Sequence, residues 1–206
     1  MKQAILLALL LSACAGVAQS PKPEPVKSQT SQFKSIVPDA SWERISFQSI
    51  NERASLANLS TLRMELKKDD LELRIWNGFG LTALEGFVLR RNAGQWSAIH
   101  LDGIHPKLPR EKHQKDLPAP KSGWNEFWRK LVEMGIFTLP DAYEIGCSTF
   151  MLDGMSYVVE INHEFTYRTY MYDNPSYAKC EQARRMISIG NFIAEQFDVA
   201  EMATKK

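Results

Sequence analysis

The chain has 206 residues, with 25 Lys and Arg side chains against 24 Asp and Glu, a formal net charge of +1. This balance argues against a nucleic-acid partner, because such binding depends on many contacts between Lys or Arg and phosphate. The hydrophobic fraction of 44% is high enough for a folded core, and the length suits a single domain.

The N-terminus has the layout of an export signal. Lys2 precedes an apolar run over residues 4–11, which is far shorter than the ~20 residues that span a bilayer, and small residues follow. The string Leu11-Ser12-Ala13-Cys14 resembles the lipobox of bacterial lipoproteins. The resemblance implies a signal peptide over residues 1–13, and an acylated Cys14 that carries palmitate and anchors the mature chain to the membrane.

The same resemblance bears on location. The residue after Cys14 is alanine and not the aspartate that retains such proteins in the inner membrane, which implies an outer-membrane protein facing the periplasm if the host is Gram-negative. The alternative is an ordinary signal peptide cut after Ala15 or Ala18, which would give a secreted protein.

A spacer follows the cysteine. Pro21, Pro23 and Pro25 favour a stiff, extended segment, and the polar residues after them cannot bury a core. We therefore predict a tether over residues 14–38 and one globular domain over residues 39–206. Removal of Lys2 with the signal peptide leaves 24 basic and 24 acidic side chains, so we expect no polybasic membrane contact.

Two cysteines remain for the exported domain. Disulfides persist outside the cytoplasm, so Cys147 and Cys180 are expected to pair. The chain-entropy model gives a stabilisation of ~3–4 kcal/mol for a closed loop of about 34 residues. Two free buried thiols are the alternative, because cysteine is among the most buried residue types.

The first half of the domain is predicted to be mainly strands. Ile45, Phe47 and Ser49 alternate with polar residues, which favours a strand. Residues 51–62 are ambiguous, because their leucines lie at helical spacing and are also compatible with a short helix. Alternation then predicts strands over residues 71–76, 84–91 and 95–101, joined by short turns as an antiparallel meander. Residues 102–121 carry four prolines and no periodicity, and are expected to form a long loop or a disordered insertion.

The second half contains two predicted helices around a hairpin. Apolar residues at helical spacing predict a helix over about 122–135, with Ser122 as N-cap, Gly135 at its C-terminal end, and Trp124 and Trp128 packed in the core. A second helix is expected over about 177–198. The fold class is therefore α+β, an antiparallel sheet of about five to seven strands packed by two main helices.

The hairpin supplies the candidate binding face. If the odd-numbered residues of both strands share the buried face, the turn must have an odd number of residues, and we predict Asn162-His163-Glu164. The even-numbered residues would then form a more polar outer face. Interface residue types gather there. The predicted binding face consists of Glu160, Arg168, Tyr170 and Tyr172. The hairpin resembles those of uncharacterised bacterial exported proteins, which implies no activity.

Catalytic motifs are missing from the sequence. It has no Gly-x-Ser-x-Gly, His-Glu-x-x-His or phosphate-binding loop, so we predict no catalytic residues and no cofactor. His100, His105 and His113 could hold zinc, but their spacing suits no regular element and we expect no metal site.

Two function hypotheses follow. The first is a non-enzymatic, lipid-anchored envelope protein that acts as a binding, assembly or inhibitor module with a protein partner. The alternative is an envelope hydrolase acting on cell-wall or glycan material through carboxylates such as Glu160 or Glu85.

Overall fold

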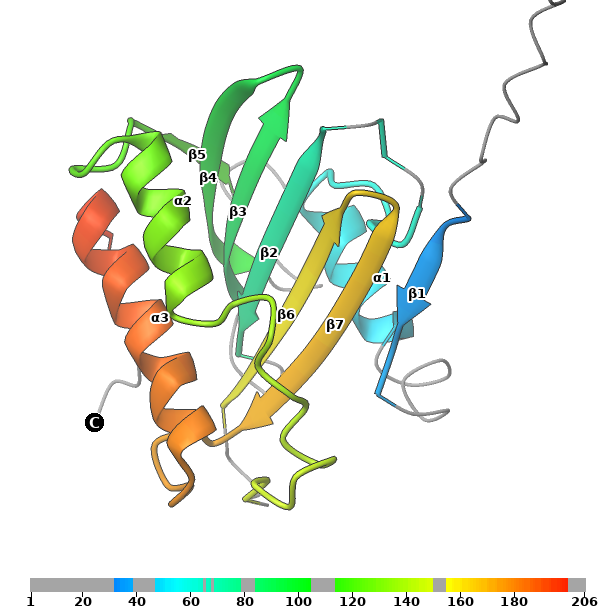
Figure 1. Ribbon diagram of the computed structural model, residues 1–206, viewed down its shortest axis with the longest axis vertical. Coiled ribbons are helices and arrows are strands. Elements are labelled where there is room, and N and C mark those ends of the chain that lie inside the picture. The colour runs from blue at the N-terminus through cyan, green and yellow to red at the C-terminus, as the bar shows by residue number, and fades with distance from the viewer. Residues whose placement is uncertain are drawn as a thin grey trace, which may run out of the picture. The chain divides into compact units, whose positions relative to one another are not determined.

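The computed structural model describes residues 32–38, 47–64, 66–67, 69–78, 84–104, 114–149 and 155–199 (Figure 1). The chain divides into two compact units, Met1–Thr30 and Ser31–Lys206, and all described residues belong to the second. The predicted signal peptide and Cys14 lie outside the described residues. No helix in the described segments is both long and apolar enough to cross a membrane.

Within these described segments, seven strands form one sheet in the order β1-β7-β6-β2-β3-β4-β5. Every neighbouring pair is antiparallel except β1 and β7, which run parallel. The strands are β1 (Lys34–Ile36), β2 (Leu71–Asn77), β3 (Leu84–Asn92), β4 (Gln95–Ile104), β5 (Gln114–Leu117), β6 (Ser156–His163) and β7 (Thr166–Asp173). The predicted α+β class and the meander of β2, β3 and β4 are confirmed.

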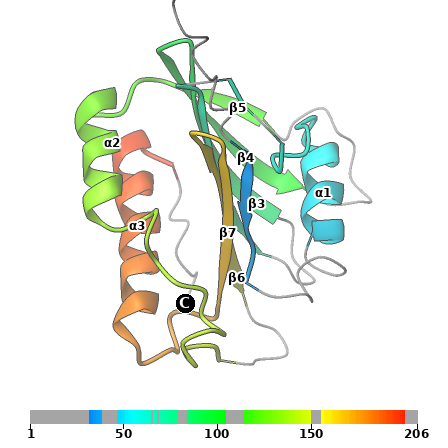
Figure 2. The same cartoon turned by 45° about the vertical axis from the view of Figure 1, so that its right-hand side comes forward.

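Helices cover both faces of the sheet. Helices α2 (Trp124–Glu133) and α3 (Glu181–Phe197) lie on one face, and α1 (Phe47–Leu56) lies on the other (Figure 2). The sheet therefore separates two cores, because successive side chains of a strand point to opposite faces. Ile75 packs in the larger core with α2 and α3, whereas its neighbour Trp76 packs in the core under α1.

The helix α1 corrects one prediction. Phe47 and Ser49 were expected in a strand, but both belong to this helix. Ile50 and Ala54, both buried, lie on its inner face, and the buried Ala57 continues their helical spacing directly after the helix ends. This repeat covers more residues than the short alternation before it, and the burial of that face favours the helix.

The helix α2 begins slightly later than expected. Its N-cap is Gly123, with φ +77°, and not Ser122, and no side chain caps it. Gly135 follows the C-terminal end with φ +88°, as predicted from its tolerance of positive φ. Trp124 and Trp128 are partly buried against the core, where both rings contact Trp96 at centroid distances of 6.2 and 5.5 Å.

Two predicted irregular segments contain strands. Within the expected loop 102–121, β4 extends to Ile104 and Gln114–Leu117 forms β5, paired with residues 98–101. Charged side chains on an edge strand protect it from further pairing and hide the alternation that would reveal it. Within the expected tether 14–38, Lys34–Ile36 forms β1 at the other edge of the sheet.

The turn of the second hairpin differs from the prediction. Residues His163 and Thr166 are paired, so the turn contains only Glu164 and Phe165, which have φ values of 49° and 65°. Positive φ at both turn residues is the geometry that matches the twist of a two-residue hairpin. The predicted three-residue turn is wrong. Glutamate and phenylalanine rarely adopt positive φ, so the sequence does not indicate a two-residue turn here.

Candidate functional site

The hairpin register separates the residues of the predicted binding face. With a two-residue turn, odd-numbered residues of β6 share a face with even-numbered residues of β7, as in the pairs of Ile161 with Arg168 and Val159 with Tyr170. Glu160 therefore points to the α1 side, and Arg168, Tyr170 and Tyr172 to the α2 and α3 side. The expectation that these four side chains share one solvent-facing surface is wrong.

Three of the four side chains hold the segment that leaves α2. The hydroxyls of Tyr170 and Tyr172, both buried, donate hydrogen bonds of 2.8 Å to the carbonyl oxygens of Ile136 and Pro140. The Arg168 guanidinium donates to two further carbonyls of the same segment, those of residues 137 and 139. Burial raises the pKa of both tyrosines, so they remain neutral donors.

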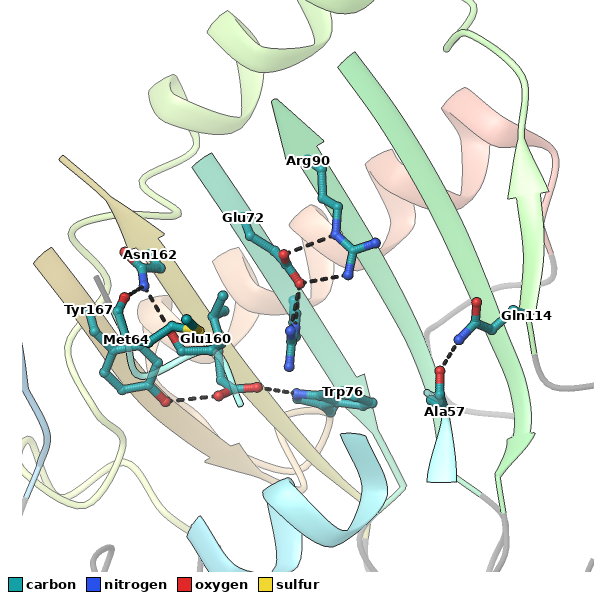
Figure 3. A network of polar contacts seen from close by, with 11 residues as sticks. Ala57, Met64, Glu72, Trp76, Arg90, Gln114, Glu160, Asn162 and Tyr167 are labelled. Carbon is teal, nitrogen blue, oxygen red and sulfur yellow. Dashed lines mark hydrogen bonds and ion pairs between the residues drawn. The ribbon is translucent and has the colours of Figure 1, made fainter. Parts of the chain in front are cut away.

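Glu160 lies in a polar cluster beneath α1 (Figure 3). Glu160 is 1% exposed. Its two carboxylate oxygens accept hydrogen bonds from Trp76 Nε1 at 2.7 Å and from the Tyr167 hydroxyl at 2.9 Å. Burial raises the pKa of the Glu160 carboxyl, and the positive charge of Arg74 opposes this shift. Arg74 is the partner of Glu160 across β2 and β6. The carboxyl is thus enclosed by aromatic donors and one cation.

A second carboxylate continues the cluster. Glu72 accepts hydrogen bonds from Arg74 Nε at 2.7 Å, and from Arg90 Nε and Nη2 at 2.9 and 3.1 Å. Burial alone would raise the pKa of Glu72, but the hydrogen bond from Arg90 and the charges of both arginines outweigh it and lower the pKa. The order Arg90, Glu72, Arg74, Glu160 therefore alternates positive and negative groups across three strands.

One amide fixes the chain above this cluster. Asn162 Nδ2 donates to the carbonyl oxygens of Leu62, at 2.7 Å, and Met64 (Figure 3). Nearby, Arg63 Nε donates to Ser35 Oγ at 2.9 Å and so connects the same segment to β1. These contacts hold the stretch after α1 against the sheet and β1.

Glu160 should make stability depend on pH. Its pKa is higher in the folded than in the unfolded chain, so its contribution is fully present below the unfolded pKa and is lost as pH rises through the folded pKa. We expect Glu160→Gln to remove this slope, with about 1.4 kcal/mol of difference per unit of pKa shift. Urea unfolding of both proteins between pH 4 and 8 measures it. A difference between the two proteins that does not change with pH would contradict the expectation.

β1 pairs only with residues 166–168 of β7, and the segment after α2 covers the same edge of β7 at Met171. The Asp141 carboxylate accepts hydrogen bonds from the backbone N–H groups of Met171 and Tyr143 at 2.8 and 2.9 Å, and Ala142 N–H donates to the Met171 carbonyl at 3.0 Å. This segment takes the place of a neighbouring strand, and such cover prevents the edge from pairing with another chain.

The two cysteines of the domain lie close enough to form the predicted pair. Cys147 and Cys180 are at disulfide distance, with Cα atoms 6.0 Å apart. Cys180 is also the N-cap of α3, where its Sγ accepts from the Ala183 N–H at 3.3 Å. The pair connects the segment after α2 to the start of α3, a structural position.

The histidine cluster remains largely outside the described residues. His100 lies in β4, whereas His105 and His113 fall in a part of the chain that is not described. Within the described ranges, no group of three His, Cys, Asp or Glu side chains is arranged to hold a metal ion.

Comparisons with known proteins identify no relative of this chain. The chain matches no protein-family model, no curated protein and no solved structure.

Proposed function

We propose that this chain is a lipid-anchored envelope protein that binds another protein, as an assembly or inhibitor module, and does not act as an enzyme. The lipobox resemblance at Cys14 and the proline-rich stretch after it support the anchor. The balanced charge supports a protein partner over a nucleic acid.

The observation that carries this proposal is the burial of Glu160. A general acid must reach its substrate, within ~3 Å or through one water. Glu160 is 1% exposed and both of its oxygens are engaged by Trp76 and Tyr167. The strongest sequence candidate for catalysis therefore stabilises the interior, which favours binding over hydrolysis.

In-cell crosslinking of the wild type beside Cys14→Ala tests the proposal. We expect the wild type in the membrane fraction and in a discrete crosslinked complex, and the variant in the soluble fraction without that complex, because anchoring places the domain beside its partner. Mass spectrometry identifies the captured protein. If both forms fractionate alike and neither captures a protein, the anchor and the binding role are both contradicted.

The alternative remains an envelope hydrolase for cell-wall or glycan material. It needs two facing carboxyl groups within ~5–10 Å in a concave site. Among the described residues, those that line a pocket of about 340 Å³ between α2 and α3 include one carboxylate, Glu133, with Met134, Arg185 and Ser188. Glu85, the other sequence candidate, is partly buried in β3 opposite Asn77. Release of soluble fragments from cell-wall material by the purified protein would favour the hydrolase.

A further inference from the structure

The two cysteines of the pair lie in unequal surroundings. Cys147 is 7% exposed and belongs to the larger core. Cys180 is partly exposed, and its neighbours along the chain, Lys179 and Glu181, are both exposed. The Cys180 side of the pair is therefore the more accessible to a molecule in solution.

The start of α3 stabilises negative charge on the Cys180 sulfur. Its Sγ accepts the Ala183 N–H at 3.3 Å, and the partial positive charge at the N-terminus of a 17-residue helix acts at the same point. The carboxylate of Glu181 would oppose this effect, but it is 2.5 Å from the guanidinium of Arg185. Exchange with disulfides is carried out by thiolates. Once the pair is reduced, Cys180 is the sulfur prepared for nucleophilic attack.

Contacts on both sides hold Cys147 in place without the bond. The Cys147 N–H donates to the Ala142 carbonyl at 2.7 Å, and Ala142 is itself hydrogen-bonded to β7. Two residues after Cys147, the Thr149 carbonyl accepts from Asn174 Nδ2 at 2.8 Å. These contacts keep Cys147 near Cys180 when the pair is reduced, so it can attack a disulfide that has formed there.

We propose that Cys147 and Cys180 form a thiol–disulfide exchange site in the folded domain. Cys180 forms the mixed disulfide with an external thiol compound, and Cys147 attacks that mixed disulfide to close the pair again. This activity goes beyond the binding role proposed above and does not depend on it.

The exchange conserves atoms and electrons. In the reducing direction an external thiolate attacks the Cys180 Sγ, a new sulfur–sulfur bond forms, and the bond to Cys147 breaks. The Cys147 sulfur leaves with the electron pair and takes a proton. A second external thiolate attacks the external sulfur of the mixed disulfide and releases the Cys180 thiolate. Two external thiols are thus oxidised to a disulfide while the pair is reduced, and the reverse sequence oxidises the pair.

Glutathione disulfide is the probe for the role of each sulfur. Two full-length chains carry Cys14→Ala with either Cys147→Ser or Cys180→Ser, so each keeps one thiol and both lack the bond. At pH 7 we expect the folded chain with Cys180 to form the glutathione adduct about tenfold faster than the folded chain with Cys147. Urea that unfolds both chains should make the two rates equal. Mass spectrometry of the intact chains measures the adduct, and circular dichroism checks the fold.

Either of two results would overturn the assignment of Cys180. Equal adduct rates in the folded chains would show that the surroundings of the two sulfurs do not matter. A faster reaction of the chain that keeps only Cys147 would reverse the two roles.

Reduction of the intact pair tests exchange in the folded domain without a destabilised variant. The full-length Cys14→Ala chain is treated with dithiothreitol at several urea concentrations below its unfolding transition, and the thiols formed are counted by alkylation and mass spectrometry. We expect the initial rate to be nearly independent of urea, because Cys180 is accessible in the folded chain. A rate that follows the unfolded fraction would show that exchange requires unfolding, which would overturn the proposal and leave the pair with a structural role alone.

Discussion

Replacing Arg74 with methionine is expected to lower the free energy of unfolding by about 3–5 kcal/mol, the usual cost of removing one partner from a buried ion pair. Arg74 is 1% exposed and contacts Glu72, and its charge also faces Glu160. Its loss leaves Glu160 buried without its nearest cation, while Arg90 still serves Glu72. Urea unfolding at pH 7 measures the change.

Two comparisons make this test specific. Arg129→Met removes an arginine that pairs with Glu126 and Glu133 on the exposed side of α2, and should cost far less than Arg74→Met, because solvent screens exposed ion pairs. Adding Glu160→Gln to Arg74→Met should recover part of the loss, because a neutral amide needs no counter-charge. Equal losses in Arg74→Met and Arg129→Met would contradict the buried alternation of charges.

Replacing both Cys147 and Cys180 with alanine is expected to lower the free energy of unfolding by ~3–4 kcal/mol, from the entropy of the opened loop. The sequence separation of the pair is 33 residues, and its Cα distance of 6.0 Å suits a disulfide. A reducing agent should lower the free energy of unfolding of the wild type by the same amount. It should not change that of the double variant.

The N-cap role of Cys180 requires its own control. Cys180→Ser breaks the pair but keeps a side-chain acceptor for the Ala183 N–H, so it should be more stable than Cys180→Ala by about 1 kcal/mol. Thiol titration of the unfolded, unreduced protein, in a Cys14→Ala background, counts the bond directly. Two reactive thiols there would contradict the disulfide.

Local periodicity accounts for the elements that were predicted correctly. The strands β2, β3 and β4 show alternation beside turn residues, and α2 and α3 show apolar residues at helical spacing. Each pattern arises within one element, from the side chains that face the core. Such a signal needs no knowledge of the partner element.

The elements that were predicted wrongly are those whose structure depends on contact with another element of the fold. β5 is defined by its pairing with β4, and α1 by its packing on the sheet. The turn of Glu164 and Phe165 reverses which residues of β7 share a face with β6. The turn is one residue shorter than predicted. Because the side-chain period of a strand is two, this difference places Tyr170 and Tyr172 in the larger core and not on the predicted outer face.

The sequence by itself determined the fold class, the meander, the two main helices and the candidate cysteine pair, because each depends on local pattern or composition. Only the tertiary structure decided that Glu160 and Arg74 are buried together, and that Glu160 and Tyr170 face opposite sides of the sheet. Burial and proximity depend on which segments meet across the sheet, and residues far apart in the chain carry no local signal of that meeting.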